Sequence, residues 1–260
     1  MKTGNLIIGG LFCAAAMNLI GGTPAPEKKD AQTTNAVPFM DAAGSCFRFG
    51  DKTVQVTPSG YIRITKSDKL IATVYFFGNT PYSSCFDNVI LEVKKFPHPY
   101  SKKRTGVSSF SADKAQNAFI IKGKIPYQKD GEAEILGDYT QTVSLTPENK
   151  IRVKLEFTRP ESVEKGSLLM FCSVPQAKTY TNDKEPKEFG KKWVELKKKF
   201  PVIANGTDAD NTFRIISIMM NQMWAVPGKQ INFGSIADKR KPNIRIIEFE
   251  LDLLNGEGQK

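Results

Sequence analysis

The sequence is almost without histidine, since His98 is the only one among 260 residues. One imidazole disfavours metal sites built from several histidines and mechanisms that need two of them. The glycine-rich fingerprint of dinucleotide-binding folds and the phosphate-binding P-loop are also missing. No long segment with a 3.6-residue period separates the apolar runs, so folds that alternate helices with parallel strands are disfavoured as well.

Charge, by contrast, is plentiful. Hydrophobic residues make up 40% of the chain and charged residues 25%, a balance that permits a packed core. Lysine and arginine number 37 against 27 acidic residues, which gives a net charge of +10. The length suggests one large domain or two small ones.

The first 25 residues have the pattern of an export signal peptide. Lys2 provides the positive start, residues 6–20 are apolar, and small residues follow at 21–25. The apolar run falls short of the roughly 20 residues that span a bilayer. A buried N-terminal helix is the alternative, but four glycines would weaken it. We expect a periplasmic or extracellular protein whose mature chain has no transmembrane span.

Residues 26–39 are rich in proline, threonine and charge, and we expect them to form a flexible leader. Residues 40–260 show no clear internal linker and no repeat of fixed period. We expect them to fold as a single domain.

Beyond the predicted signal peptide the chain has three cysteines: Cys46, Cys85 and Cys172. In an exported protein Cys46 and Cys85 are the natural candidates for a disulfide, because both lie near the start of apolar segments. Three buried, reduced thiols are the equal alternative, since pairing cannot be derived from sequence. The spacings match no zinc motif, and we expect no metal and no cofactor.

Short runs with alternating apolar residues recur along the chain and predict β-strands. They lie at residues 52–57, 60–65, 70–77, 89–93, 118–125, 138–146, 150–158, 167–174, 212–219 and 243–251. The segments 138–146 and 150–158 form the clearest hairpin, with alternate residues of the second arm apolar. Many strands with polar turns favour an all-β fold, a large antiparallel β-sandwich with at most one or two short helices. Residues 112–118 and 191–200 are the helix candidates, although a strand fits 191–200 equally well.

The second half of the chain resembles the galactose-mutarotase-like β-sandwiches, or supersandwiches, of carbohydrate-active proteins. The resemblance lies in the order of residues 138–157, 168–175, 190–201 and 244–254. It implies a supersandwich-like architecture and a role in binding sugars. Mutarotases use two histidines and a carboxylate, so the single His98 does not support mutarotase chemistry here.

Basic residues cluster beside aromatic ones at two places, and such clusters can bind a polyanion. The candidate ligand-binding residues are Tyr100, Lys102, Lys103, Arg104, Trp193, Lys197, Lys198 and Lys199. For an exported protein the expected partner is a carbohydrate or another envelope polymer, acidic polymers included. No nucleic-acid motif is present, so we expect no nucleic-acid partner. A solvated, lysine-rich surface without a ligand is the plain alternative.

Trp193 and Trp224 are the only tryptophans. Lysines flank Trp193, which could therefore lie exposed and stack on a sugar ring, with Tyr61, Tyr75, Tyr82 and Tyr139 assisting. Methionines surround Trp224, for which we expect core packing.

No catalytic group can be assigned. Glu248 and Glu250 share one face of their predicted strand, but no second carboxylate can be matched to them as glycoside hydrolysis requires. The leading hypothesis is a non-catalytic exported β-sandwich that binds carbohydrate or another envelope polymer. An unrecognised or degenerate enzyme of the same fold and a structural envelope protein are the alternatives.

Overall fold

The computed structural model describes residues 38–44, 46–58, 60–79, 107–129, 132–158, 167–206, 212–241 and 243–253. All of them belong to the compact unit Thr34–Lys260. In this part of the chain every regular element is a strand, and no helix occurs, so none is present there that could cross a membrane.

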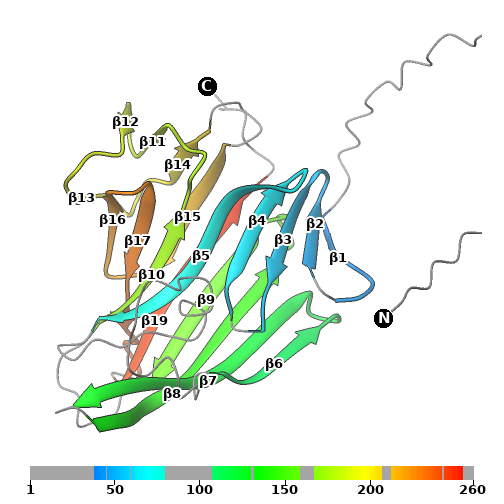
Figure 1. Ribbon diagram of the computed structural model, residues 1–260, viewed down its shortest axis with the longest axis vertical. Coiled ribbons are helices and arrows are strands. Elements are labelled where there is room, and N and C mark those ends of the chain that lie inside the picture. Colours follow the sequence, from blue (N-terminus) through cyan, green and yellow to red (C-terminus); the bar gives the residue numbers. More distant parts are fainter. Residues whose placement is uncertain are drawn as a thin grey trace, which may run out of the picture. The chain divides into compact units, whose positions relative to one another are not determined.

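Figure 1 labels all the strands except β18. Their bounds are β1 Phe39–Met40, β2 Cys46–Phe49, β3 Lys52–Val56, β4 Ile62–Lys66, β5 Lys69–Asn79, β6 Val107–Asp113, β7 Ala118–Lys129, β8 Glu132–Leu145, β9 Ile151–Thr158, β10 Ser167–Ser173, β11 Thr179–Thr181, β12 Pro186–Glu188, β13 Val194–Glu195, β14 Val202–Asn205, β15 Phe213–Met219, β16 Gln222–Val226, β17 Gln230–Gly234, β18 Ile236–Ala237 and β19 Ile244–Asp252.

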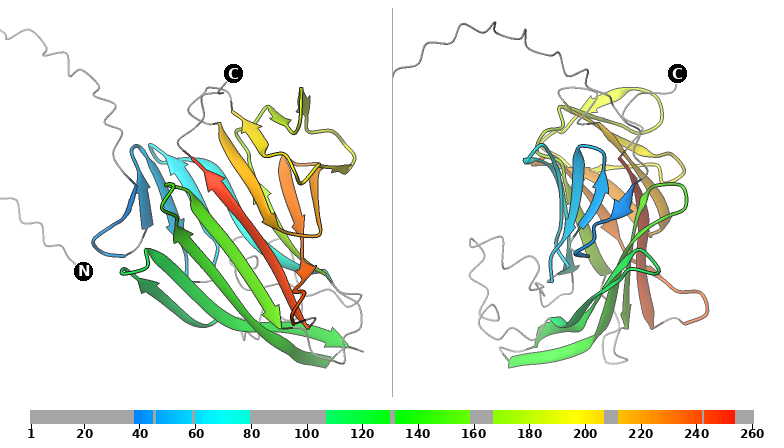
Figure 2. Two further views of the ribbon diagram at one scale, coloured as in Figure 1. Left: turned by 180° about the vertical axis from the view of Figure 1, so that it is seen from behind. Right: turned by 90° about the vertical axis from the view of Figure 1, so that its right-hand side faces the viewer.

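The strands form two antiparallel sheets. Sheet A has the order β1-β2-β3-β4-β5-β10-β17-β16-β13, and sheet B the order β12-β11-β14-β15-β19-β9-β8-β7-β6, with β18 also paired to β19. Among the described strands, β1 and β13 are the edges of sheet A, and β12 and β6 are the edges of sheet B. The two layers are seen separately in the right-hand view of Figure 2. The predicted all-β antiparallel sandwich is therefore confirmed.

One hydrophobic core lies between the two sheets. Aromatic pairs cross it at three places along the sheets: Phe47 with Phe119 at 4.9 Å, Phe76 with Tyr139 at 5.0 Å, and Phe233 with Phe249 at 4.4 Å between ring centroids. Such ring contacts add to the stabilisation from burial and fix the distance between the layers.

Alternation along each strand decides which residues enter the core. In β9 the residues Ile151, Val153, Leu155 and Phe157 are buried, whereas the residues between them are partly or fully exposed. The predicted hairpin is confirmed as β8 and β9, and Asn149 in its turn adopts a left-handed backbone with φ 60°. Asparagine tolerates this conformation better than most residues.

Neither of the two helix candidates forms a helix. Residues 191–200 contain the short strand β13 rather than a helix, because Val194 and Glu195 pair with Ala225 and Trp224 of β16. Residues 112–118 hold the end of β6, a turn and the first residue of β7. The predicted strand at residues 89–93 lies outside the described residues.

Candidate functional site

A row of side chains crosses the outer face of sheet A, the face turned away from the core. The printed registers pair Tyr75 of β5 with Phe171 of β10, Phe171 with Asn232 of β17, Asn232 with Trp224 of β16, and Trp224 with Glu195 of β13. Directly opposite residues on neighbouring strands point to the same face. We call this set, with Tyr61 before β4 and Trp193 before β13, the aromatic row.

At one end of the aromatic row three rings stack in sequence. Tyr61 and Tyr75 are 5.8 Å apart with planes 9° from parallel, and Tyr75 and Phe171 are 5.2 Å apart at 17°. Gln230 Nε2 donates a hydrogen bond of 3.1 Å to the Tyr75 hydroxyl oxygen. Burial, and then the nearby Tyr61 and Cys172, raise the pKa of Tyr75 above its ordinary value. The hydroxyl therefore stays protonated at neutral pH and can donate.

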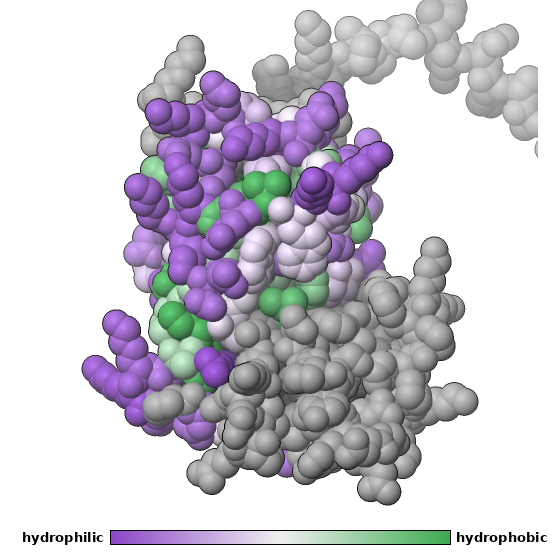
Figure 3. Space-filling model, turned by 90° about the vertical axis from the view of Figure 1, so that its left-hand side faces the viewer, coloured by the Kyte–Doolittle hydropathy of each residue, from purple (hydrophilic) through white to green (hydrophobic). Residues whose placement is uncertain are grey.

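The two tryptophans stand at the other end. Trp193 is 56% exposed, and its ring meets that of Trp224 edge to face at 6.0 Å. The Trp224 ring lies over Gly234, where a Cβ would come within 3.3 Å of two ring carbons. The missing side chain of Gly234 thus leaves room for the indole. Figure 3, which faces the side where β13 and β16 lie in Figure 1, shows pale and green groups bordered by purple hydrophilic side chains.

Asn232 stands between these two groups of rings and is 1% exposed. Among the residues that the structure describes, neither its amide nitrogen Nδ2 nor its amide oxygen Oδ1 has a hydrogen-bond partner. A buried amide without a partner costs about 1–3 kcal/mol, and native structures rarely tolerate it without a reason. One donor and one acceptor therefore lack a partner beneath an otherwise aromatic surface.

The structure corrects the prediction that Trp224 packs in the core. Met223 and Ala225 on either side of it are buried in the core, so alternation along β16 directs Trp224 outward. The methionines near it in the sequence serve the inner face. Trp193 is exposed, as the sequence suggested.

The predicted lysines lie close to the aromatic row, but each makes a contact of its own. Lys197 is bound to the Asp183 carboxylate, and Lys198 Nζ donates 2.5 Å to the Asn221 carbonyl oxygen. The ammonium of Lys199 lies 4.9 Å from the centre of the Phe200 ring. All three side chains are exposed, and Lys197 also lines a hollow of about 370 Å³ together with Asp183 and Glu195.

Other predicted residues cannot be placed. Tyr100, Lys102, Lys103 and Arg104 lie outside the described residues, as does Cys85. The Cys46 thiol donates to Asp41 Oδ2 at 3.3 Å. The pairing of Cys46 with Cys85 remains a prediction.

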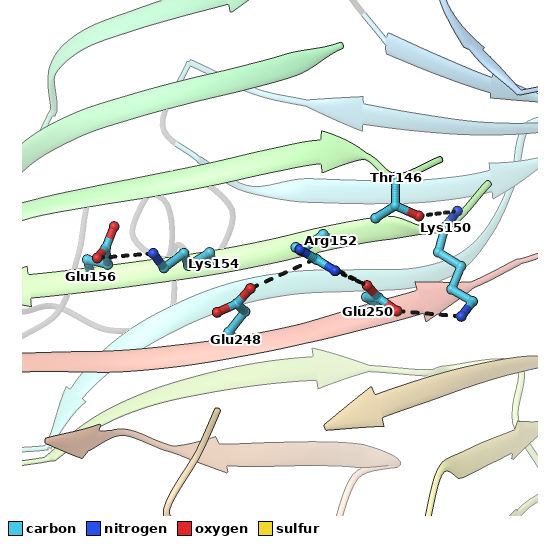
Figure 4. A network of polar contacts seen from close by, with 7 residues as sticks. All are labelled: Thr146, Lys150, Arg152, Lys154, Glu156, Glu248 and Glu250. Carbon is cyan, nitrogen blue, oxygen red and sulfur yellow. Dashed lines mark hydrogen bonds and ion pairs between the residues drawn. The ribbon is translucent and has the colours of Figure 1, made fainter. Parts of the chain in front are cut away.

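The outer face of sheet B carries charge instead of rings. Arg152 Nη2 donates to Glu250 Oε1 at 2.7 Å, its Nε lies 3.8 Å from Glu248, and Lys150 lies 3.6 Å from the other oxygen of Glu250 (Figure 4). Lys154 pairs with Glu156 on the same face at 3.2 Å. The hydrogen bond to Glu250 raises the pKa of Arg152. Glu248 and Glu250 share one face as expected, and both are held in ion pairs.

Sequence reasoning missed Phe171, Gln230 and Asn232 as members of the site. An asparagine in the middle of an apolar strand is unusual, and Asn232 in the segment QINFG was the available clue. Its neighbours could not be named, because β10 and β16 reach β17 only through the fold.

No family model matches this chain, and no match was found among the curated proteins.

Proposed function

We propose that this protein is a non-catalytic carbohydrate-binding β-sandwich whose ligand lies along the aromatic row of sheet A. The observation that carries the proposal is the unpartnered, buried amide of Asn232 between two groups of aromatic rings. The apolar face of a sugar ring stacks on an aromatic side chain, while the hydroxyl groups at its edge need hydrogen-bond partners. The row offers both features side by side.

The length of the row favours a polymer over a single sugar. It crosses from β4 to β13, which is five steps between neighbouring strands. At about 4.8 Å per step the row measures roughly 24 Å, enough for several sugar units. Stacking positions at both ends, with hydrogen-bonding groups between them, suit an extended chain.

Binding without catalysis fits the acids of the row. Glycoside hydrolysis by the usual route needs two carboxyl groups on opposite sides of the scissile bond. Glu195 is the one carboxylate in the aromatic row, and it stands at the end of the row. With one carboxylate in the row, we take from the resemblance to mutarotase-like sandwiches only the architecture and the binding of sugars.

We also propose that the protein acts outside the cytoplasm, where the polymer would belong to a cell envelope. The support is the signal-like pattern of residues 1–25. N-terminal sequencing of the protein from its native host tests this. We expect a mature chain that begins between residues 17 and 28, and recovery of intact Met1 in the cytoplasm would contradict export.

The binding experiment uses Trp193→Ala with Phe39→Ala as its control. Phe39 is 52% exposed, almost the same as Trp193, but it lies on β1 outside the row. Isothermal titration calorimetry with neutral and acidic polysaccharides should show at least tenfold weaker binding for Trp193→Ala. The affinity of Phe39→Ala should equal that of the wild type. Loss of one stacking ring is expected to cost about 1–3 kcal/mol, by analogy with base stacking on aromatic side chains.

Salt dependence then separates the row from the lysines. Binding by stacking changes little with ionic strength. The attraction of exposed lysines for an anion acts over a Debye length of about 8–10 Å at physiological salt, and it becomes weaker as the salt concentration rises. A variant carrying Lys197→Ser, Lys198→Ser and Lys199→Ser should keep most of the affinity for a neutral polymer. If no polysaccharide binds at about millimolar concentration, carbohydrate binding is wrong and a structural role becomes the leading hypothesis.

A further inference from the structure

A polar hollow of about 360 Å³ adjoins the aromatic row on the outer face of sheet A. It lies over β2, β3 and β4, and its lining includes Arg48, Thr53, Gln55, Arg63, Thr65 and Asp68. Register pairs Gln55 with Arg63, and Arg63 with Thr73 of β5, so the hollow continues the same face that carries Tyr75.

The hollow is rich in hydrogen-bond donors that the protein does not use. Arg48 Nη1 donates to Thr53 Oγ1 at 2.8 Å, which leaves most of its guanidinium free. Arg63 makes no hydrogen bond or ion pair with any described residue. The carboxylate in the lining, Asp68, is in the β4–β5 turn and pairs with neither arginine. Two unneutralised guanidinium groups favour an anion.

The chemistry of these groups favours a carboxylate. A guanidinium presents two parallel N–H bonds that match the two oxygens of a carboxylate, which an ammonium group cannot do. Threonine hydroxyls and the Gln55 amide beside the arginines suit the hydroxyl groups that surround a carboxylate on a sugar ring. Arg48 and Arg63, unlike the lysines near Trp193, therefore offer the paired N–H donors that recognise a carboxylate.

The distance to the aromatic row fits one polymer on both. Arg63 follows Tyr61 by two residues on the same face, a separation of about 6.6 Å along an extended strand. Tyr61 itself is buried, whereas Tyr75 beside it is only partly buried. A sugar stacked on Tyr75 would therefore place a substituent of its own ring, or of the next ring, within reach of Arg63.

We infer that Arg48 and Arg63 form an anionic subsite, and that the polymer bound by the aromatic row is an acidic polysaccharide with uronic acid residues. This inference rests on the proposed function. It assigns the acidic part of the recognition to the β2–β4 end of sheet A.

The test compares each acidic polymer with its own neutral form. Polygalacturonate, alginate and hyaluronate are titrated against the full chain, and so is the carboxyl-reduced form of each, in which the sugar backbone is retained. We expect at least one acidic polymer to bind about tenfold more tightly than its reduced form. The double variant Arg48→Gln/Arg63→Gln should lower that affinity to the level of the reduced form without changing the affinity for the reduced form.

Two further variants control for charge and geometry. Arg240→Gln removes one positive charge from an exposed turn between β18 and β19 and should leave both affinities unchanged. Arg63→Lys keeps the charge but not the paired donors, and should give an intermediate affinity. Circular dichroism and thermal unfolding should match the wild type for all variants, because Arg48 and Arg63 are exposed.

The failures of the two proposals are distinguishable. If acidic and reduced polymers bind equally, or if the double variant binds the acidic polymer as tightly as the wild type, the anionic subsite is wrong and the carbohydrate row stands. If no polymer of either charge binds, the proposed function fails together with this inference.

Discussion

At the scale of single residues, Asn232 shows how a site can lower stability. Its amide is buried and has no partner, whereas Asn205 on sheet B donates to the hydroxyls of Thr179 and Thr181 at 3.0 Å each. The two asparagines thus form a matched pair, one with its hydrogen bonds satisfied and one without.

Replacing both asparagines by leucine tests this difference. Asn232→Leu should leave the free energy of unfolding unchanged or raise it by about 1–2 kcal/mol, because an unsatisfied buried group is removed. Asn205→Leu should lower it by about 1–2 kcal/mol, because real hydrogen bonds are lost. Urea unfolding measures both changes.

Polysaccharide titration completes the comparison. Asn232→Leu should weaken binding at least tenfold despite its normal stability, and Asn205→Leu should not affect binding. A large loss of stability in Asn232→Leu would show that the amide has a structural role.

Residue identity predicted only part of this site. For Trp193, flanked by lysines, the sequence supported exposure and core packing equally, and the side chain is 56% exposed. Trp224 was assigned to the core because of its methionine neighbours, but strand alternation overrides local composition. The sequence marks Asn232 only as an asparagine within an apolar strand, because a missing hydrogen-bond partner is a property of the folded chain.

At the scale of elements, β8 and β9 depend on a close backbone approach at Gly137. A Cβ at this position would lie 2.0 Å from the Thr158 carbonyl oxygen at the end of β9. Gly190, by contrast, has open space around it and an ordinary backbone conformation. The two glycines therefore differ in what an added methyl group would meet.

Gly137→Ala should lower the free energy of unfolding by at least about 1 kcal/mol, because the β8–β9 pairing must shift to admit the methyl group. Gly190→Ala should change it by less than about 0.5 kcal/mol. Chemical denaturation compares the two variants, and equal effects would contradict the close approach.

The ion pairs of β9 and β19 allow a second comparison within one strand. Arg152 pairs with the nearly buried Glu250, whereas Lys154 pairs with the more exposed Glu156. Arg152→Met should destabilise the protein by about 1–3 kcal/mol, less than a fully buried pair would cost because Arg152 itself is partly exposed. Lys154→Met should cost at most about 0.5 kcal/mol. Thermal unfolding of both variants at low and high salt measures the two losses of stability.

The positions of the strands were the most predictable feature of this protein. Alternation located β3, β4, β9, β10, β15 and β19 to within about two residues, because the two-residue period is written into the sequence. Their neighbours in the sheets were not predictable beyond the hairpins. β10 pairs with β5 on one side and β17 on the other, and these pairings join residues that are far apart in the chain.

At the scale of the whole molecule, burial links global stability to alkaline pH. Cys172 lies in the core between the two sheets, and burial raises the pKa of its thiol from 9.0 to about 12. Burial also raises the pKa values of Tyr75 and Tyr180. In each case the folded protein holds a proton that the unfolded chain releases.

Between about pH 9 and pH 12 the folded state therefore binds more protons, and the free energy of unfolding falls as pH rises. Cys172→Val should reduce this slope, because the group that contributes most is gone. Urea unfolding at pH 8, 9 and 10 measures it, and an unchanged slope in the variant would contradict the assignment. Iodoacetamide should label Cys172 only in denaturant, since a buried thiol does not react as the thiolate.

The position of β19 determines when this protein can become native. β19 follows every other described strand along the chain, yet it lies inside sheet B between β15 and β9, as the view from behind in Figure 2 shows. Until this segment has been synthesised, β9 and β15 have no shared neighbour, and Phe233 of sheet A lacks its ring partner Phe249. Pairings of such long range make folding slow, on a scale of milliseconds to seconds for comparable β-proteins. A nascent chain that extends only as far as β18 thus lacks the central strand of sheet B, a state in which a chaperone can still hold it unfolded.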